Sequence, residues 1–227
     1  MAMRHIASLS YGKDSLAMLE AIYRLGYPLD EIVHVEIWAT DTISANLPPV
    51  IEFKRRADRI IKERYGLEVR HVCATNDDGS KRTFEKMFYR VPPRRKNKKY
   101  DGLCLGWPML RGRWCLRALK LSAMPKHGAD EVWYIGIAAD ETARINNDNN
   151  AGSVMPLVDI GWTESDAMAW CMILYHRPMR HHTGMVAGFA RAKTRIHCVH
   201  YAAIGRICGR SCSSGIMTHR LPSRPMG

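Results

Sequence analysis

Hydrophobic and polar positions along this chain alternate between two patterns. Residues 5–25 begin with a short apolar stretch, pass through a Ser/Gly turn, and continue with apolar residues at helical spacing. This pattern predicts a strand followed by a helix that docks on a sheet. The apolar face of the helix carries Leu16, Leu19, Ile22 and Tyr23.

The same alternation continues to about residue 170. Proline at a helix start, glycine at a helix end, period-two alternation and a Thr-x-x-Asp capping box mark the boundaries. In chain order the pattern predicts a strand over Ile32–Trp38, a helix from Pro48 that stops at Gly66, a strand over Leu67–Val72, a helix over Cys115–Lys126, a buried strand over Val132–Ile137, and a helix from Thr163 through Trp170.

Strands separated by helices are typical of an α/β fold. We expect a three-layer sandwich, with a mostly parallel, twisted sheet that carries helices on both faces. Residues 1–170 then form one nucleotide-binding domain, with its ligands at the carboxyl ends of the strands.

The turn over Ser10–Ser15 carries the clearest chemistry. Backbone N–H groups at a helix start lack internal partners and lie at the positive end of the helix dipole. Gly12 allows close approach of a ligand, Lys13 adds a charge, and Ser10 and Ser15 add hydroxyls. We expect a bound phosphate, held by Ser10, Tyr11, Gly12, Lys13, Asp14 and Ser15. The alternative is a capped helix with a solvated Lys13.

Other polar residues follow predicted strands and should reach the same sheet edge. Asp41 lies just after the second strand, and Gly136–Arg144 reads Gly-Ile-Ala-Ala-Asp-Glu-Thr-Ala-Arg after a later one. Taken singly, Asp41 is a turn residue and Asp140 begins a helix. Together with the turn, these segments indicate a site.

Two of these segments resemble a known family. Ser10–Ser15 looks like the S-G-G-K-D-S loop of the PP-loop ATP pyrophosphatases, with Tyr11 in place of the first glycine. Gly136–Arg144 is similar to the G-I-R-x-D-E-S-x-R segment of the phosphoadenosine phosphosulfate reductase group, with Ala138 in place of arginine. The resemblance extends over residues 4–170.

The resemblance implies an adenine nucleotide alpha-hydrolase-like fold and an enzyme that uses ATP or an adenylyl sulfate, with Mg²⁺ neutralising the phosphates. Lys13 and Ser15 would be catalytic, and Asp41, Gly136, Asp140 and Arg144 would contact the nucleotide. The E-C-G-L-H motif that carries the reductase nucleophile is absent, which favours adenylation over reduction.

Basic residues occur in two further segments. One resembles the family's Arg-rich segment, where a polyanionic nucleotide would meet Arg111, Arg113, Arg117 and Lys120; the alternative is a solvated helix face. The other is a Pro-containing loop that would bind DNA or RNA or close over a nucleotide, through Arg90, Arg94, Arg95, Lys96, Lys98 and Lys99. A plain solvated loop is its alternative.

The cysteines give no metal motif. Cys104 and Cys115 lie eleven residues apart with no C-x-x-C in the chain, so the sequence does not support zinc. Some relatives in the resembled group carry an iron–sulfur cluster. Cys115 would be a ligand of such a cluster only if two further cysteines were restored at the C-terminus.

The net charge of +12 belongs mostly to the C-terminal segment. No Asp or Glu follows Asp166, and in the basic tail, residues 171–227, no stretch after about Tyr175 sustains helical or strand periodicity. This tail is a nucleic-acid-binding arm, a disordered extension, or the product of a frameshift near residues 170–177. Back-translation with a two-nucleotide offset can encode Cys-Trp-Phe-Cys and an acidic, amphipathic C-terminus. Sequencing the gene through that point tests the frameshift.

The chain has no apolar run long enough for a membrane span and no signal peptide, so we expect a cytoplasmic protein that does not bind membranes. The sequence does not indicate an oligomeric state. Its leading interpretation is a PP-loop enzyme of sulfur-related chemistry. The alternatives are a DNA- or RNA-associated sulfur-modification module and an inactive homologue.

Overall fold

The computed structural model describes residues 3–93, 98, 101–108, 113–125, 128–150 and 152–175, all within the unit Met1–His182. Several predictions fall outside these residues: the frameshift or disorder of the tail beyond Tyr175, the nucleic-acid contacts of Arg94, Arg95, Lys96 and Lys99, and the nucleotide contact of Arg111.

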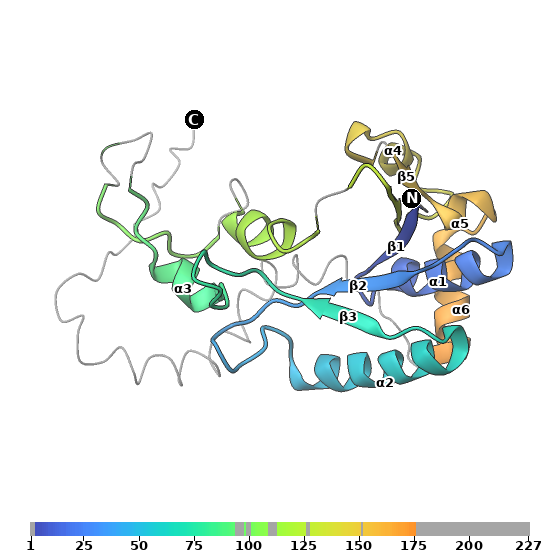
Figure 1. Ribbon diagram of the computed structural model, residues 1–227, viewed down its shortest axis with the longest axis horizontal. Helices are drawn as coiled ribbons and strands as arrows, with labels where there is room; N and C mark the ends of the chain where they lie inside the picture. Colours follow the sequence, from blue (N-terminus) through green and yellow to red (C-terminus); the bar gives the residue numbers. More distant parts are fainter. Residues whose placement is uncertain are drawn as a thin grey trace, which may run out of the picture. The chain divides into compact units, whose positions relative to one another are not determined.

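Five parallel strands form one sheet in the order β3-β2-β1-β4-β5 (Figure 1). Parallel pairing requires a crossover between successive strands, and helices supply most of these connections. The structure therefore confirms an α/β fold with a parallel sheet. The strands are β1 (Arg4–Leu9), β2 (Glu31–Val35), β3 (Val69–Val72), β4 (Glu131–Tyr134) and β5 (Ser153–Val154).

The helices begin and end largely where local chemistry predicts. The helix α2 (Pro48–Tyr65) starts at its prolines and ends at Gly66, which has the left-handed φ of 73°. At the start of α6 (Glu164–Tyr175), Thr163 and Asp166 form the expected capping box, with bonds of 2.9 and 3.3 Å. The other helices are α1 (Lys13–Leu25), α3 (Phe84–Tyr89), the π-helix η2 (Leu116–Leu121), α4 (Thr142–Ile145), the 3-10 helix η3 (Asp148–Asn150) and α5 (Pro156–Asp159).

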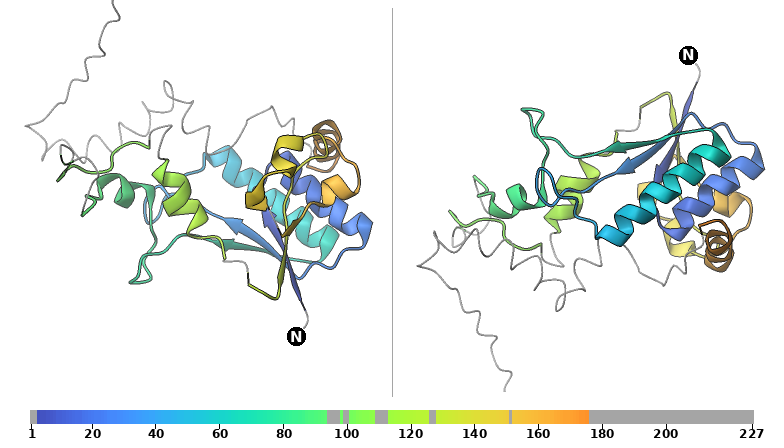
Figure 2. Two further views of the ribbon diagram at one scale, coloured as in Figure 1. Left: turned by 90° about the horizontal axis from the view of Figure 1, so that it is seen from above. Right: turned by 90° about the horizontal axis from the view of Figure 1, so that it is seen from below.

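Both faces of the central strands are buried, but unequally. On one face Ala7 and Leu9 of β1 join the main core, which α1, α2, α5 and α6 complete. Figure 2 shows α1 and α2 running together along this side of the sheet. On the other face Ile6 packs with Val33 and Trp133 in a small cluster, against which Met124 lies. Alternate residues along a strand therefore pack on opposite faces of the sheet.

Some details differ from the predictions. Tyr23 was expected on the buried face of α1, yet it is 61% exposed and packs edge-on against Tyr65. The second strand ends at Val35, because the chain then turns back and Trp38 pairs with Ser44 in an isolated bridge. The predicted helix over Cys115–Lys126 contains the π-helix η2, and the last helix continues to Tyr175.

None of the helices in the described ranges combines the length and the apolar character that a membrane crossing needs.

Candidate functional site

The turn between β1 and α1 is tied together through its two serines. Ser15 Oγ accepts a hydrogen bond of 3.1 Å from the Ser10 amide and donates one of 3.0 Å to the Gly12 carbonyl. Ser10 Oγ lies 2.9 Å from Ser15 Oγ. Gly12 is the N-cap of α1 and makes no side-chain capping bond. The turn therefore presents a helix start with no side-chain cap, the arrangement that binds anions.

Tyr11 shapes this turn by a left-handed backbone. Its φ of 57° is the only positive value at a non-glycine among the described residues. Such a conformation costs about 1–2 kcal/mol. The ring is buried, and its hydroxyl donates to Asp58 and lies 3.3 Å from His71 Nε2. Burial and the Asp58 hydrogen bond raise the pKa of Tyr11, so the hydroxyl stays protonated.

Three carboxylates lie close together at the start of α1, and two of them pair with Lys13. Lys13 Nζ lies 2.6 Å from Asp14 Oδ1 and 3.5 Å from Glu164 Oε2. Oxygen atoms of Asp14, Glu141 and Glu164 all lie within 4.8 Å of one another. Burial raises the pKa of Asp14, an effect that Lys13 opposes. Carboxylate oxygens are ligands that Mg²⁺ accepts, so this group could hold such an ion.

The segment after β4 packs directly on the turn. A Cβ atom added at Gly136 would lie 2.8 Å from the backbone of Asp14 and Ser15, so only glycine fits there. Asp140 Oδ1 accepts from the Glu164 amide at 3.0 Å, and Arg144 bonds Glu141 at 2.6 Å. The predicted convergence of this segment with the turn is therefore observed. Asp140 thus fixes the backbone at the start of α6, and Arg144 holds the Glu141 carboxylate.

Asp41 makes its contacts elsewhere. Its carboxylate is 62% exposed and accepts from Lys86 Nζ of α3 at 2.6 Å, while its carbonyl accepts from Lys81 Nζ at 3.2 Å. The structure therefore links Asp41 to α3, and a nucleotide contact would need Lys86 to release it.

The remaining basic candidates of the described ranges lie in or near η2 and after α3. Arg113 and Arg117 are exposed, and Lys120 is half-buried with its pKa lowered by burial. Arg90 ends α3 and accepts the Leu105 amide through its carbonyl at 2.9 Å, and the carbonyl of Lys98 accepts the Asp101 amide at 3.0 Å. Binding of a polyanion by these side chains stays a prediction.

Among the cysteines of the described ranges, Cys73, Cys115 and Cys171 are free thiols. Burial raises the pKa of Cys115, and it raises that of Cys171 to about 12. Within the described ranges, the groups close enough to share a metal ion contain no cysteine. An iron–sulfur cluster at Cys115 stays tied to the hypothetical C-terminus.

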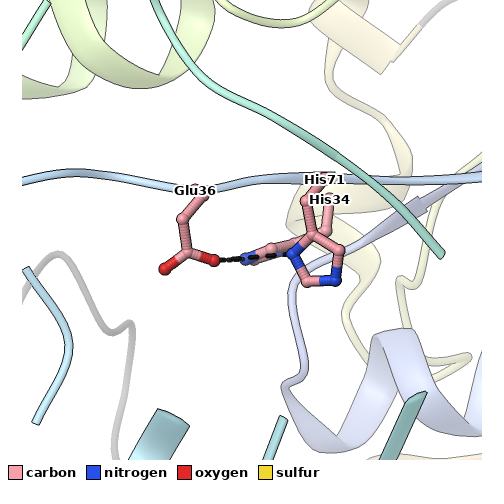
Figure 3. A group of neighbouring side chains, drawn as sticks. All are labelled: His34, Glu36 and His71. Carbon is pink, nitrogen blue, oxygen red and sulfur yellow. Dashed lines mark ion pairs between the residues drawn. The ribbon is translucent and has the colours of Figure 1, made fainter. Parts of the chain in front are cut away.

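A second polar group lies beneath Tyr11, at the carboxyl ends of β2 and β3 (Figure 3). His34 Nδ1 donates to the Leu9 carbonyl at 2.8 Å, which leaves Nε2 as an acceptor. Nε2 lies 2.8 Å from Lys54 Nζ of α2, the matching donor. Burial lowers the pKa of His34, in agreement with a neutral ring.

Glu36 connects the two imidazoles of this group. Its Oε2 lies 3.4 Å from His34 Nε2, 3.6 Å from His71 Nδ1 and 3.0 Å from Lys54 Nζ. Burial alone would raise the pKa of Glu36, but these contacts hold it well below its usual range. Hydrogen bonds with Asp58 and Glu36 raise the pKa of His71 to about 9.

The sequence analysis assigned no role to this group, nor to Glu141 and Glu164. One signal was present. His34 and Glu36 are two apart in the predicted strand over Ile32–Trp38, so they share a face, and that face also carries the buried Ile32. Lys54 and Asp58 are four apart on the helix that covers it.

Comparisons of the chain with protein-family models, with curated proteins and with solved structures find no match.

Proposed function

We propose that this chain is a PP-loop adenine-nucleotide-binding enzyme of the phosphoadenosine phosphosulfate reductase-like family, with an adenine nucleotide alpha-hydrolase-like fold. The observation that carries the proposal is the β1–α1 turn, which has an uncapped helix start, a lysine and a packed glycine segment beside it. It lies at the carboxyl end of a central parallel strand, where α/β proteins bind nucleotides.

The turn residues would act mainly by position and charge. The N–H groups of the first turn of α1 would bind the pyrophosphate portion of ATP, together with Lys13. Phosphate oxygens would replace Asp14 as the partner of Lys13. Asp14, Glu141 and Glu164 would then be the ligands of Mg²⁺, which supplies further neutralisation of phosphate charge.

Adenylation is the reaction that this arrangement suits. A nucleophile on the acceptor would attack the α-phosphorus, a P–O bond to the pyrophosphate would break, and the turn would stabilise the departing negative charge. The reductase motif with its cysteine is absent from the sequence. We therefore favour ATP over an adenylyl sulfate as the nucleotide, in chemistry that transfers sulfur or nitrogen.

Isothermal titration calorimetry with ATP and Mg²⁺, and separately with adenylyl sulfate, tests the proposal. We expect binding of one nucleotide by the wild type and at least about a tenfold loss in Lys13→Ala, because one charge-assisted contact is removed. Lys62→Ala is the matched control, since Lys62 pairs with Glu68 on the surface at the far end of α2. No heat with either nucleotide would contradict the proposal.

A second candidate function is binding of single-stranded DNA or RNA by the surface around α3. Tyr89 and Trp107 are 49% and 39% exposed, and Phe88 contacts both rings. Arg90 follows directly, and exposed rings beside basic residues suit base stacking. Fluorescence anisotropy with labelled oligonucleotides should show binding that weakens steeply with salt and with Trp107→Ala. Binding insensitive to both changes would exclude this surface.

A further inference from the structure

We propose that His34, Glu36 and His71 form a binding site for a zinc-class divalent metal ion at the carboxyl ends of β2 and β3. The three donor atoms are His34 Nε2, Glu36 Oε2 and His71 Nδ1, which all lie within 4.8 Å of one another. Figure 3 shows the Glu36 carboxylate joined by ion pairs to both imidazole rings. This inference does not depend on the nucleotide site.

The spacing of the donors fits tetrahedral coordination. Zinc lies about 2.0–2.1 Å from nitrogen and oxygen ligands, which places neighbouring ligands of a tetrahedron about 3.3 Å apart. Glu36 Oε2 lies 3.4 Å from His34 Nε2 and 3.6 Å from His71 Nδ1. Small side-chain shifts would therefore place the three donors at three corners of a tetrahedron around the ion and leave the fourth corner open.

The second shell already orients both imidazoles. His34 Nδ1 donates to the Leu9 carbonyl, which leaves the Nε2 lone pair free to bind a cation. His71 Nε2 lies 3.2 Å from Asp58 Oδ2, so its other nitrogen faces Glu36. Histidines that ligate metals are held by a backbone carbonyl or a carboxylate on the other ring nitrogen in this way.

A cation already sits among these donors. Lys54 Nζ lies 2.8 Å from His34 Nε2 and 3.0 Å from Glu36 Oε2, as the counter-charge that a metal ion would provide. Metal binding would displace this ammonium, and Asp58 lies one helical turn further along the same face of α2 to receive it. The proton on His71 Nδ1 would pass to solvent as the metal–nitrogen bond forms.

The donor chemistry selects the metal class. Two imidazoles and one carboxylate suit zinc and its transition-metal neighbours, whereas Mg²⁺ and Ca²⁺ prefer all-oxygen sites. His71 is 37% exposed at its side chain, which provides a route for the ion from solvent.

The test is a titration of the chelator-treated full chain with Zn²⁺ alone, in competition with a chromophoric chelator. Cysteines and histidines elsewhere in the chain also bind zinc. The quantity compared is therefore the difference in zinc stoichiometry and affinity between the wild type and each variant. We expect His71→Ala and Glu36→Gln each to lose one equivalent of zinc, or at least about a hundredfold in its affinity, more than the loss typical of a second-shell change. His5→Ala, outside the cluster, should keep the wild-type stoichiometry.

Two further variants separate metal binding from a purely structural role. Lys54→Met removes the competing ammonium but keeps the stem, so zinc should bind more tightly than in the wild type. Asp58→Asn should weaken zinc by about tenfold. Circular dichroism confirms that each variant is folded. The proposal is overturned if zinc stoichiometry and affinity stay unchanged in His71→Ala and Glu36→Gln, or if neither the wild type nor folded Lys54→Met binds zinc.

Discussion

The two ends of α1 each adjoin a buried group of charged side chains, and the groups differ in how fully their members are bonded. At the C-terminal end, the buried Glu20 carboxylate accepts bonds of 2.8 and 2.9 Å from Arg64, 2.8 Å from Arg24 and 3.1 Å from Tyr65. Four donors satisfy the four lone-pair sites of a carboxylate. This group has fixed donors and a single acceptor.

At the N-terminal end, the group beneath Tyr11 contains two imidazoles, whose nitrogens switch between donor and acceptor. Lys54 occupies one of these acceptors, and His71 bridges two carboxylates. The two groups therefore have different consequences. A saturated group of fixed donors stabilises the fold, whereas a group with exchangeable partners can also bind a cation.

Of the changes that test this difference, Glu20→Ala should have the largest effect on the free energy of unfolding. Removal of the buried acceptor leaves Arg24, Arg64 and Tyr65 without their common partner, and we expect a loss of about 3 kcal/mol in the free energy of unfolding. Urea denaturation measures it. Glu52→Ala, at an exposed position of α2, is the control and should change stability by less than about 0.5 kcal/mol. Equal losses of unfolding free energy in Glu20→Ala and Glu52→Ala would show that the Glu20 group stabilises the fold no more than an exposed glutamate does.

Acid should weaken the Glu20 group. Burial raises the pKa of Glu20, but the bonds from Arg64, Arg24 and Tyr65 bring it below its ordinary value of 4.5. A carboxylate with a depressed folded-state pKa stabilises the protein above pH 4.5, and this stability is lost as the pH falls through the folded pKa. The wild type should therefore lose more stability below pH 4.5 than Glu20→Gln. Parallel pH profiles would contradict this assignment.

Gly136→Ala tests how far the N-terminal end of α1 depends on close packing, in addition to its charged contacts. The added methyl would lie 2.8 Å from the backbone of Asp14, and such overpacking costs about 2 kcal/mol. Denaturation and nucleotide titration measure the effect on the turn. In Gly128→Ala the new methyl would meet only the flexible side chain of Glu131 at 3.3 Å, so this control should lose less. Unchanged stability and nucleotide binding in Gly136→Ala would mean that the segment after β4 can shift away from the β1–α1 turn.

Tyr11→Phe should have the smallest effect of the four. It removes one hydrogen bond to the Asp58 carboxylate while His71 remains as a partner, which corresponds to about 1.5 kcal/mol of unfolding free energy. The exposed Tyr23→Phe serves as the control for loss of a hydroxyl. A loss far above 1.5 kcal/mol would show that the hydroxyl organises the whole group.

Local signals predicted much of the fold. Pro48 and Gly66 bound α2 in the structure as they do in the sequence, and Thr163 and Asp166 cap α6. These boundaries depend on backbone preferences that each residue carries with it. The packing of Gly136 against the β1–α1 turn followed from a rule about the edges of parallel sheets.

The group around His34 could not be predicted in the same way. The sequence analysis predicted a strand over Ile32–Trp38 in a sheet covered by helices on both faces, but it assigned no partners to the polar residues of that strand. In a parallel sheet both faces are covered, so alternating polar residues become buried and must find partners. Those partners, Lys54 on α2 and His71 on β3, lie 18 and 35 residues from Glu36 in the sequence, where local periodicity carries no information.

The left-handed backbone at Tyr11 has a thermodynamic consequence for any ligand of the turn. A glycine at this position would leave the unbound turn many conformations, and a ligand would have to select one of them. The buried ring and its bonded hydroxyl restrict those conformations before the ligand arrives. Association should therefore carry a smaller entropic penalty, and the turn should recognise its anion by shape already set in the free protein.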